Sequence, residues 1–145
     1  MFTQVSDVTI RAATVDDVDA LLGLWAVAAE NDMRPADTPQ AVRALLARDP
    51  GACLVACAEG HVVGSLIAGW DGWRAHLYRL AVHPRARRKG IGHALLDAGT
   101  QRLAGLGATR LDAMVLEGNE LGQSLWRAAG YRPQDNWRRW VRPVG

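Results

Sequence analysis

A short run of basic residues and glycines, Arg87-Arg88-Lys89-Gly90-Ile91-Gly92, is the part of the sequence best suited to chemistry. It follows an apolar stretch that ends at His83-Pro84, and it opens a segment with helical spacing, Ile91 to Leu106. The first N–H groups of a helix have no partners within the helix and lie at the positive end of its dipole, so they attract anions. Glycine lets a phosphate approach the backbone closely. We therefore predict a phosphate-binding turn at this position.

The elements that must hold this turn can be placed by hydrophobic periodicity and turn residues. We predict strands over 8–12, 52–58, 62–68, 75–82, 109–116 and 131–141, and helices over 14–29, 38–49, 91–106 and 121–129. This order indicates an α/β protein with a mixed, twisted sheet of six to seven strands, flanked by about four helices. The unit over 75–116 should be a right-handed parallel crossover. The length of 145 residues fits one domain, 1–145.

Two motifs resemble the GNAT superfamily of acyl-CoA-dependent N-acetyltransferases, in particular its small bacterial members. The first is the family pattern V-x-P-x-x-R-x-x-G-x-G, which is filled here by Val82, Pro84, Arg87, Gly90 and Gly92. The second is N-x-x-A-x-x-L-Y-x-x-x-G-F, in which Asn119, Leu125 and Gly130 match while Gly122, Trp126 and Tyr131 stand at the Ala, Tyr and Phe positions. The predicted element order also resembles the family fold over nearly the whole chain.

The resemblance implies that acetyl-CoA is the co-substrate and that no metal takes part. The backbone of Leu80, Ala81 and Val82 would pair with the pantetheine arm, and a backbone N–H near Leu80 would polarise the thioester carbonyl. Asn119 would hydrogen-bond the pantetheine, and Trp126 would pack on the cofactor or in the core. The pyrophosphate would be held by the backbone N–H groups of Arg87, Arg88, Lys89, Gly90, Ile91, Gly92 and His93.

The implied reaction is acetyl transfer to a primary amine, which needs a positioned acceptor, an N–H donor for the developing oxyanion and a route for the amine proton. Many family members carry a Tyr where this chain has Trp126, and indole is no usable acid. Tyr78, on the strand that would line the cofactor, could take its place. Members with a Glu base would place it near Met114, which cannot titrate.

The base is therefore open, and the candidates are Glu117, Asp71, Asp32, Glu30 and His76. We hypothesise that Glu117 or Asp32 orders the water that accepts the proton. Met114 and Trp126 depart from the family pattern at positions that often carry catalytic residues. An alternative function is therefore that of a CoA-binding sensor or interaction module with little or no catalysis.

Composition limits the partners. The net charge of +2 gives no reason to expect a nucleic-acid partner, and no apolar run reaches bilayer-spanning length. No signal peptide is visible, which favours the cytoplasm. Cys53 and Cys57 lie too far apart on one strand for a mutual disulfide and suit the core.

The segment Trp137 to Arg142 alternates aromatic and basic residues. We interpret it as an edge strand whose arginine stems cover the sheet, or alternatively as a homodimer contact or the rim of a site for an acidic acceptor. The sequence does not name the amine acceptor. Lining acids would favour polyamines, aminoglycosides or lysine, whereas an open groove would favour protein N-termini.

Overall fold

The structure, a computed structural model, describes residues 3–5, 7–31 and 34–145. The strands are β1 (Thr3–Val5), β2 (Val8–Ala12), β3 (Cys53–Ala58), β4 (His61–Trp70), β5 (Ala75–Val82) and β6 (Leu111–Ala113). The helices are α1 (Val18–Ala28), α2 (Pro39–Arg48), α3 (Ile91–Leu106) and α4 (Glu120–Ala128), with short 3-10 turns at Val15–Asp17 and Pro84–Ala86.

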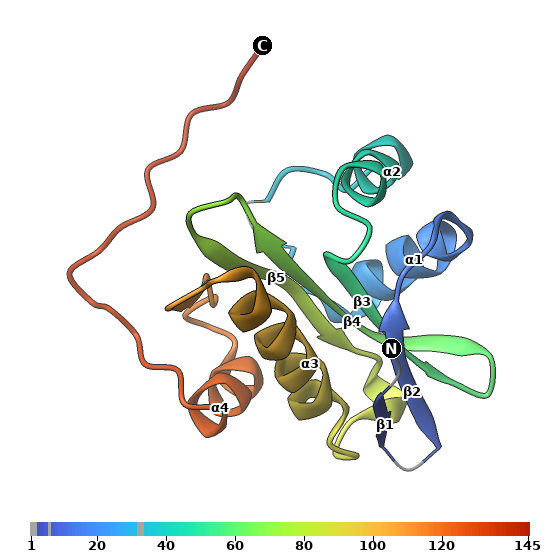
Figure 1. Ribbon diagram of the computed structural model, residues 1–145. Coiled ribbons are helices and arrows are strands. Elements are labelled where there is room, and N and C mark those ends of the chain that lie inside the picture. Colours follow the sequence, from blue (N-terminus) through green and yellow to red (C-terminus); the bar gives the residue numbers. More distant parts are fainter. Residues whose placement is uncertain (1–2, 6, 32–33) are drawn as a thin grey trace.

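The six strands form one sheet in the order β1-β2-β3-β4-β5-β6. The four pairs from β1 to β5 are antiparallel, and β5 pairs with β6 in parallel. The predicted mixed sheet and the parallel strand–helix–strand unit are thus confirmed. Helices α1 and α2 lie on one face of the sheet, and α3 and α4 lie on the other (Figure 1).

Each face of the sheet carries its own apolar core. On the first face Leu21 and Trp25 of α1 pack with Val42 of α2 and Val55 of β3. On the second face the α3 side chains Ile91, Leu95 and Leu103 pack against residues such as Leu66 of β4. Cys53 and Cys57 are both free thiols in the first core, as expected. The sheet is therefore held from both sides.

Local signals explain where the helices begin. Thr38 accepts a hydrogen bond from the Ala41 N–H, and Pro39 opens α2 at its first position. The Asp17 carboxylate accepts from the Thr14 N–H and from both terminal nitrogens of Arg11, which fixes the chain ahead of α1. Helix α3 has the predicted bounds and ends at Gly107 with a left-handed backbone.

Two predicted strands differ from the structure. The strand expected over 109–116 is reduced to Leu111–Ala113. The strand expected over 131–141 is absent: this part of the chain has no regular secondary structure and runs away from the sheet (Figure 1). Trp140 is 93% exposed, so its aromatic ring has no strand neighbour to pack on. Aromatic and basic residues alone do not create pairing without an edge that receives them.

Candidate functional site: a cleft between two parallel strands

The parallel pairing of β5 and β6 stops halfway along β5. The paired residues are Ala75 with Leu111, His76 with Asp112 and Leu77 with Ala113. Beyond Leu77, β5 continues to Val82 without a strand partner on this side among the described residues. Backbone groups there are free to bind an extended ligand.

A bulge in β5 accompanies this opening. The register of β4 with β5 shifts between Ser65 and Ile67, and Arg79 has a left-handed backbone with φ of 52°. The fully buried Ser65 hydroxyl donates to the Arg79 carbonyl at 2.8 Å and accepts from the Trp25 indole N–H, also at 2.8 Å. These two hydrogen bonds give partners to the polar groups that the bulge buries within the apolar core.

The direction of the backbone along the end of β5 follows from one hydrogen bond. The His83 N–H donates to the Val63 carbonyl of the neighbouring strand β4 at 2.8 Å. Because successive residues of a strand face opposite sides, the backbone groups of Val82 and Leu80 face away from β4. The Val82 carbonyl accordingly accepts from Nε of Arg87 at 3.2 Å.

The basic turn leads directly into α3. Arg88 and Gly90 both have left-handed backbones, with φ of 65° and 77°. Among the backbone bonds at the start of α3, the Ala94 N–H donates to the Gly90 carbonyl at 3.0 Å. The N–H groups of Ile91, Gly92 and His93 precede that bond and have no acceptor within the helix. They lie at the helix end where the sequence predicts an anion site.

Gly92 is needed for a reason that differs from the one expected. A Cβ at Gly92 would lie 2.7 Å from Cδ2 of Leu125 in α4. The missing side chain therefore lets α4 pack closely against α3, rather than only clearing space for a phosphate. Gly90 is needed because of its positive φ.

A cavity of about 680 Å³, here called the donor cavity, joins these features. Its walls include every residue predicted to bind the cofactor except Lys89: Leu80, Ala81, Val82, Arg87, Arg88, Gly90, Ile91, Gly92, His93, Asn119 and Trp126. Tyr78 lines it as well, and Glu117 does not. Asp32 lies outside the described residues.

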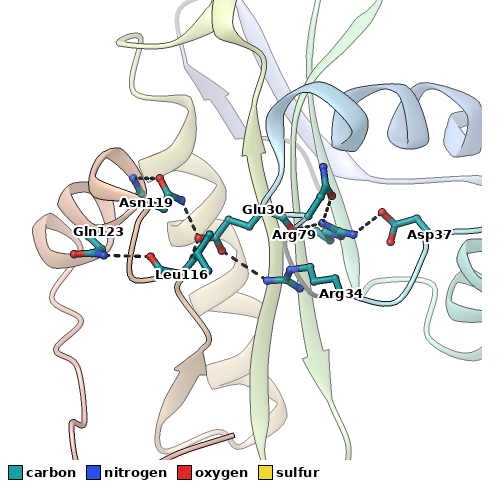
Figure 2. A network of polar contacts seen from close by, with 9 residues as sticks. Glu30, Arg34, Asp37, Arg79, Leu116, Asn119 and Gln123 are labelled. Atoms are coloured by element: carbon teal, nitrogen blue, oxygen red, sulfur yellow. Dashed lines mark hydrogen bonds and ion pairs between the residues drawn. The ribbon is translucent and has the colours of Figure 1, made fainter. Parts of the chain in front are cut away.

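Asn119 is held in place from two sides. Its Oδ1 accepts from the Gly122 N–H at 2.9 Å, which caps α4, and its Nδ2 donates to Oε2 of Glu30 at 2.9 Å. The same Glu30 oxygen accepts from the Leu116 N–H at 2.8 Å. Figure 2 shows Glu30 reaching across the cleft, so that the segment after α1 is tied to the start of α4.

A second anchor, the side chain of Arg79, holds both ends of this segment. The Arg79 guanidinium donates to the Glu30 carbonyl at 2.8 Å, to Oδ1 of Asn31 at 3.0 Å and to the Asp37 carboxylate at 2.5 Å (Figure 2). Sequence reasoning missed this role, because Arg79 looks like any outward strand residue. It did consider Glu30, but only as a base. Nothing local in the sequence marks a contact between residues 89 positions apart.

Two aromatic side chains in the cleft differ in the chemistry that they can perform. Tyr78 is 44% exposed, and partial burial raises the pKa of its phenol, with a smaller opposing effect of the Arg139 charge. Trp126 is buried, and its ring meets Tyr131 edge-on with centroids 4.8 Å apart. Trp126 therefore belongs to the core and to the cavity wall at once.

The cleft suits a long phosphorylated thioester. It offers unpaired β5 backbone along one wall, and free N–H groups and arginines at the α3 end. Such a fold and site define a class of acyl-CoA-dependent transferases. Within the described ranges, no helix combines the length and the apolar character needed to span a bilayer.

Comparison with known proteins specifies this class further. The family model for the acetyltransferase (GNAT) family matches residues 19–131. An acetyltransferase of Sodalis glossinidius, SG1711, is 34% identical over 128 residues, covering 88% of this chain and 89% of that protein. An acetyltransferase of Pectobacterium atrosepticum, ECA0875, is 33% identical over 127 residues, covering 87% and 89%. The chain belongs to the GNAT family of acetyltransferases, and its co-substrate is acetyl-CoA.

Solved structures show the same fold. The PaiA N-acetyltransferase of Thermoplasma acidophilum, in complex with coenzyme A, superposes with a TM-score of 0.75 at 18% identity, covering 89% of this chain and 92% of that one. The enzyme AAC(6')-Iy, in complex with the bisubstrate analogue CoA-S-monomethyl-acetylneamine, has a TM-score of 0.76 at 18% identity, covering 96% and 100%. The diaminobutyrate acetyltransferase EctA of Paenibacillus lautus has a TM-score of 0.70 at 21% identity, covering 83% and 73%.

Proposed function

We propose that this acetyltransferase moves the acetyl group of acetyl-CoA to a primary amine of a small molecule or peptide, by direct attack within a ternary complex. The observation that carries the proposal is the edge of β5 from Tyr78 to Val82 that has no strand partner among the described residues and runs along the donor cavity toward the start of α3. A bisubstrate analogue bound to AAC(6')-Iy joins donor and acceptor in one molecule, which supports direct attack without an acyl-enzyme.

The cofactor roles follow the walls of the donor cavity. The N–H groups at the start of α3, with Arg87 and Arg88, would hold the pyrophosphate, and the β5 backbone at Leu80 and Val82 would pair with the pantetheine. The Leu80 N–H would donate to the thioester oxygen as negative charge develops there, because the Leu80 backbone faces away from β4. Lys89, which does not line the cavity, would add only long-range positive charge.

Two proton transfers complete the reaction. Tyr78 would protonate the departing CoA thiolate, because its phenol lines the cavity and keeps its proton at neutral pH. The amine proton would pass to water ordered by Glu117 or Asp32. Glu30 fits a positioning role better, since its Oε2 already accepts two hydrogen bonds.

The proposal is tested by following thiol release from acetyl-CoA over a panel of amines. We expect release that depends on the acceptor and saturates with both substrates, and a product that carries a new amide. Tight binding of acetyl-CoA without acceptor-dependent release would instead support the CoA-binding module. The choice of base is tested separately with Glu117→Gln and Asp32→Asn. Unchanged acetylation rates and pH profiles in both variants would eliminate these two carboxylates.

A further inference from the structure

A second hollow of about 450 Å³, here called the acceptor cavity, adjoins the donor cavity. Four residues line both: Arg34, Leu77, Tyr78 and Met114. The other walls of the acceptor cavity are formed by Pro35, His76, Asp112, Ala113 and Arg139. A ligand in this hollow would therefore have a continuous path to the phenol of Tyr78 and to the free part of β5.

The charges that face the acceptor cavity are mainly positive. Its one acidic wall residue among those described, Asp112, is bound by Arg110 through two hydrogen bonds of 2.7 Å, which neutralise its charge. Neither Arg34 nor Arg139 has such a partner. Within the described part of the chain, Arg139 forms no ion pair, and Arg34 meets only Oε1 of Glu30 at 3.7 Å, beyond hydrogen-bonding distance.

Arg34 and Arg139 line the same cavity although they lie about a hundred positions apart in sequence. Burial lowers the pKa of the Arg34 guanidinium, the charges of Arg79 and Arg139 lower it further, and the carboxylates of Glu30 and Asp37 act in the opposite direction. Arg34 and Arg139 both line the acceptor cavity, where their like charges repel each other, and Glu30 offsets part of the charge of Arg34. An anion placed between them would relieve this repulsion and would gain charge-assisted hydrogen bonds.

We propose that the acceptor is an amine that also carries an anionic group, a carboxylate or a phosphate, which Arg34 and Arg139 bind while the amino group lies at Tyr78 and Met114. This inference rests on the proposed acetyl transfer and adds the substrate class to it. Polycationic amines, such as polyamines and aminoglycosides, would meet like charge in the same hollow and are rejected.

Matched acceptor pairs test this inference directly. L-lysine with cadaverine, and phosphoethanolamine with ethanolamine, share an amine and differ by one anionic group. We expect kcat/KM to be at least about tenfold higher for the anionic member of a pair, because hydrogen bonds between a guanidinium and an anion are charge-assisted. The two pairs also separate carboxylate from phosphate recognition. Equal or better turnover of the members that lack the anionic group would overturn the inference.

Variants locate the effect. Arg139→Gln should lower kcat/KM for the anionic acceptor about tenfold to a hundredfold relative to the counterpart that lacks the anionic group, with unchanged affinity for acetyl-CoA. Arg138→Gln is the matched control, because Arg138 does not line the acceptor cavity and, among the described residues, its guanidinium bonds only to the carbonyls of Asp135 and Trp137. Equal effects of the two variants would overturn the inference.

Calorimetry of the CoA-saturated protein separates failure of the inference from failure of the proposed function. If no amine supports thiol release, acetyl transfer to amines fails as a function. Phosphoethanolamine or lysine that still binds, and loses binding in Arg139→Gln but not in Arg138→Gln, would sustain the anion-binding hollow. Absence of such binding would overturn it.

Discussion

The hydroxyl of Ser65 donates a hydrogen bond to the backbone carbonyl of Arg79, and this bond holds the left-handed residue of the β5 bulge. The bulge lies just beyond the last pair of β5 with β6. A single buried polar side chain on β4 thus reaches the point where the cleft opens. The Trp25 indole on α1, which covers this face of the sheet, completes the chain of bonds by donating to the Ser65 hydroxyl.

Ser65→Ala should destabilise the protein by about 1–3 kcal/mol, because the Trp25 N–H and the Arg79 carbonyl would both lose a buried partner. Urea unfolding followed by circular dichroism measures the loss. Thr100→Ala is the control, since Thr100 is exposed and its hydroxyl donates only to the Leu96 carbonyl, one helical turn earlier, among the described residues. A loss no larger in Ser65→Ala than in the control would contradict the role of Ser65.

Gly92→Ala should destabilise the protein by about 1–3 kcal/mol, because the added methyl group would overlap Leu125. Gly105→Ala in the same helix meets no atom within 4 Å and should be neutral or should stabilise by up to about 1 kcal/mol. Leu125→Ala should partly rescue Gly92→Ala in a double-mutant cycle. Purely additive losses would show that the contact is not the cause.

Glu30→Ala should weaken acetyl-CoA binding about tenfold, since the loss of a charged acceptor frees the Leu116 N–H and the Asn119 amide at the wall of the donor cavity. Glu30→Gln keeps one acceptor oxygen and should lose less. Calorimetric titration measures both. Glu120→Gln, the exposed neighbour of Asn119 at the start of α4, serves as the control. An unchanged dissociation constant for acetyl-CoA in Glu30→Ala would contradict the positioning role of Glu30.

Tyr78→Phe should lower kcat about tenfold, less than most losses of a general acid because a thiolate is a tolerable leaving group. Burial raises the pKa of Tyr78, so its proton donation is present at neutral pH and is lost only as pH rises through that raised pKa. The alkaline limb of the kcat profile should therefore lie above about pH 10 and disappear in Tyr78→Phe. Tyr131→Phe is the control: the Tyr131 hydroxyl is buried without a hydrogen-bond partner in the described structure. Equal profiles for wild type and Tyr78→Phe would remove Tyr78 from the reaction.

Sequence reasoning succeeded where local patterns decide the structure. The glycines and apolar spacing of α3 fix its bounds, and Arg87 and Arg88 of the basic turn before it line the donor cavity, whereas Lys89 does not. It failed where a tertiary contact decides. Trp137 and Trp140 looked like strand residues, yet no edge of the described sheet pairs with them. The left-handed φ of Arg79 and the bond from Glu30 to Asn119 depend on elements far away in sequence, which no window of residues can reveal.

The close contact of Leu125 with Gly92 makes the wall of the cleft formed by α3 and α4 more rigid than the other walls. With no room between them, α3 and α4 can separate only by opening a void in the packed interior. The end of the cleft at which we propose that the phosphates bind should therefore keep one shape whether or not a donor is bound. Any accommodation of different acceptors would then fall to the opposite side of the cleft, where the strand β6 has only three residues. Evolution could thus change the acceptor in this protein without disturbing the donor.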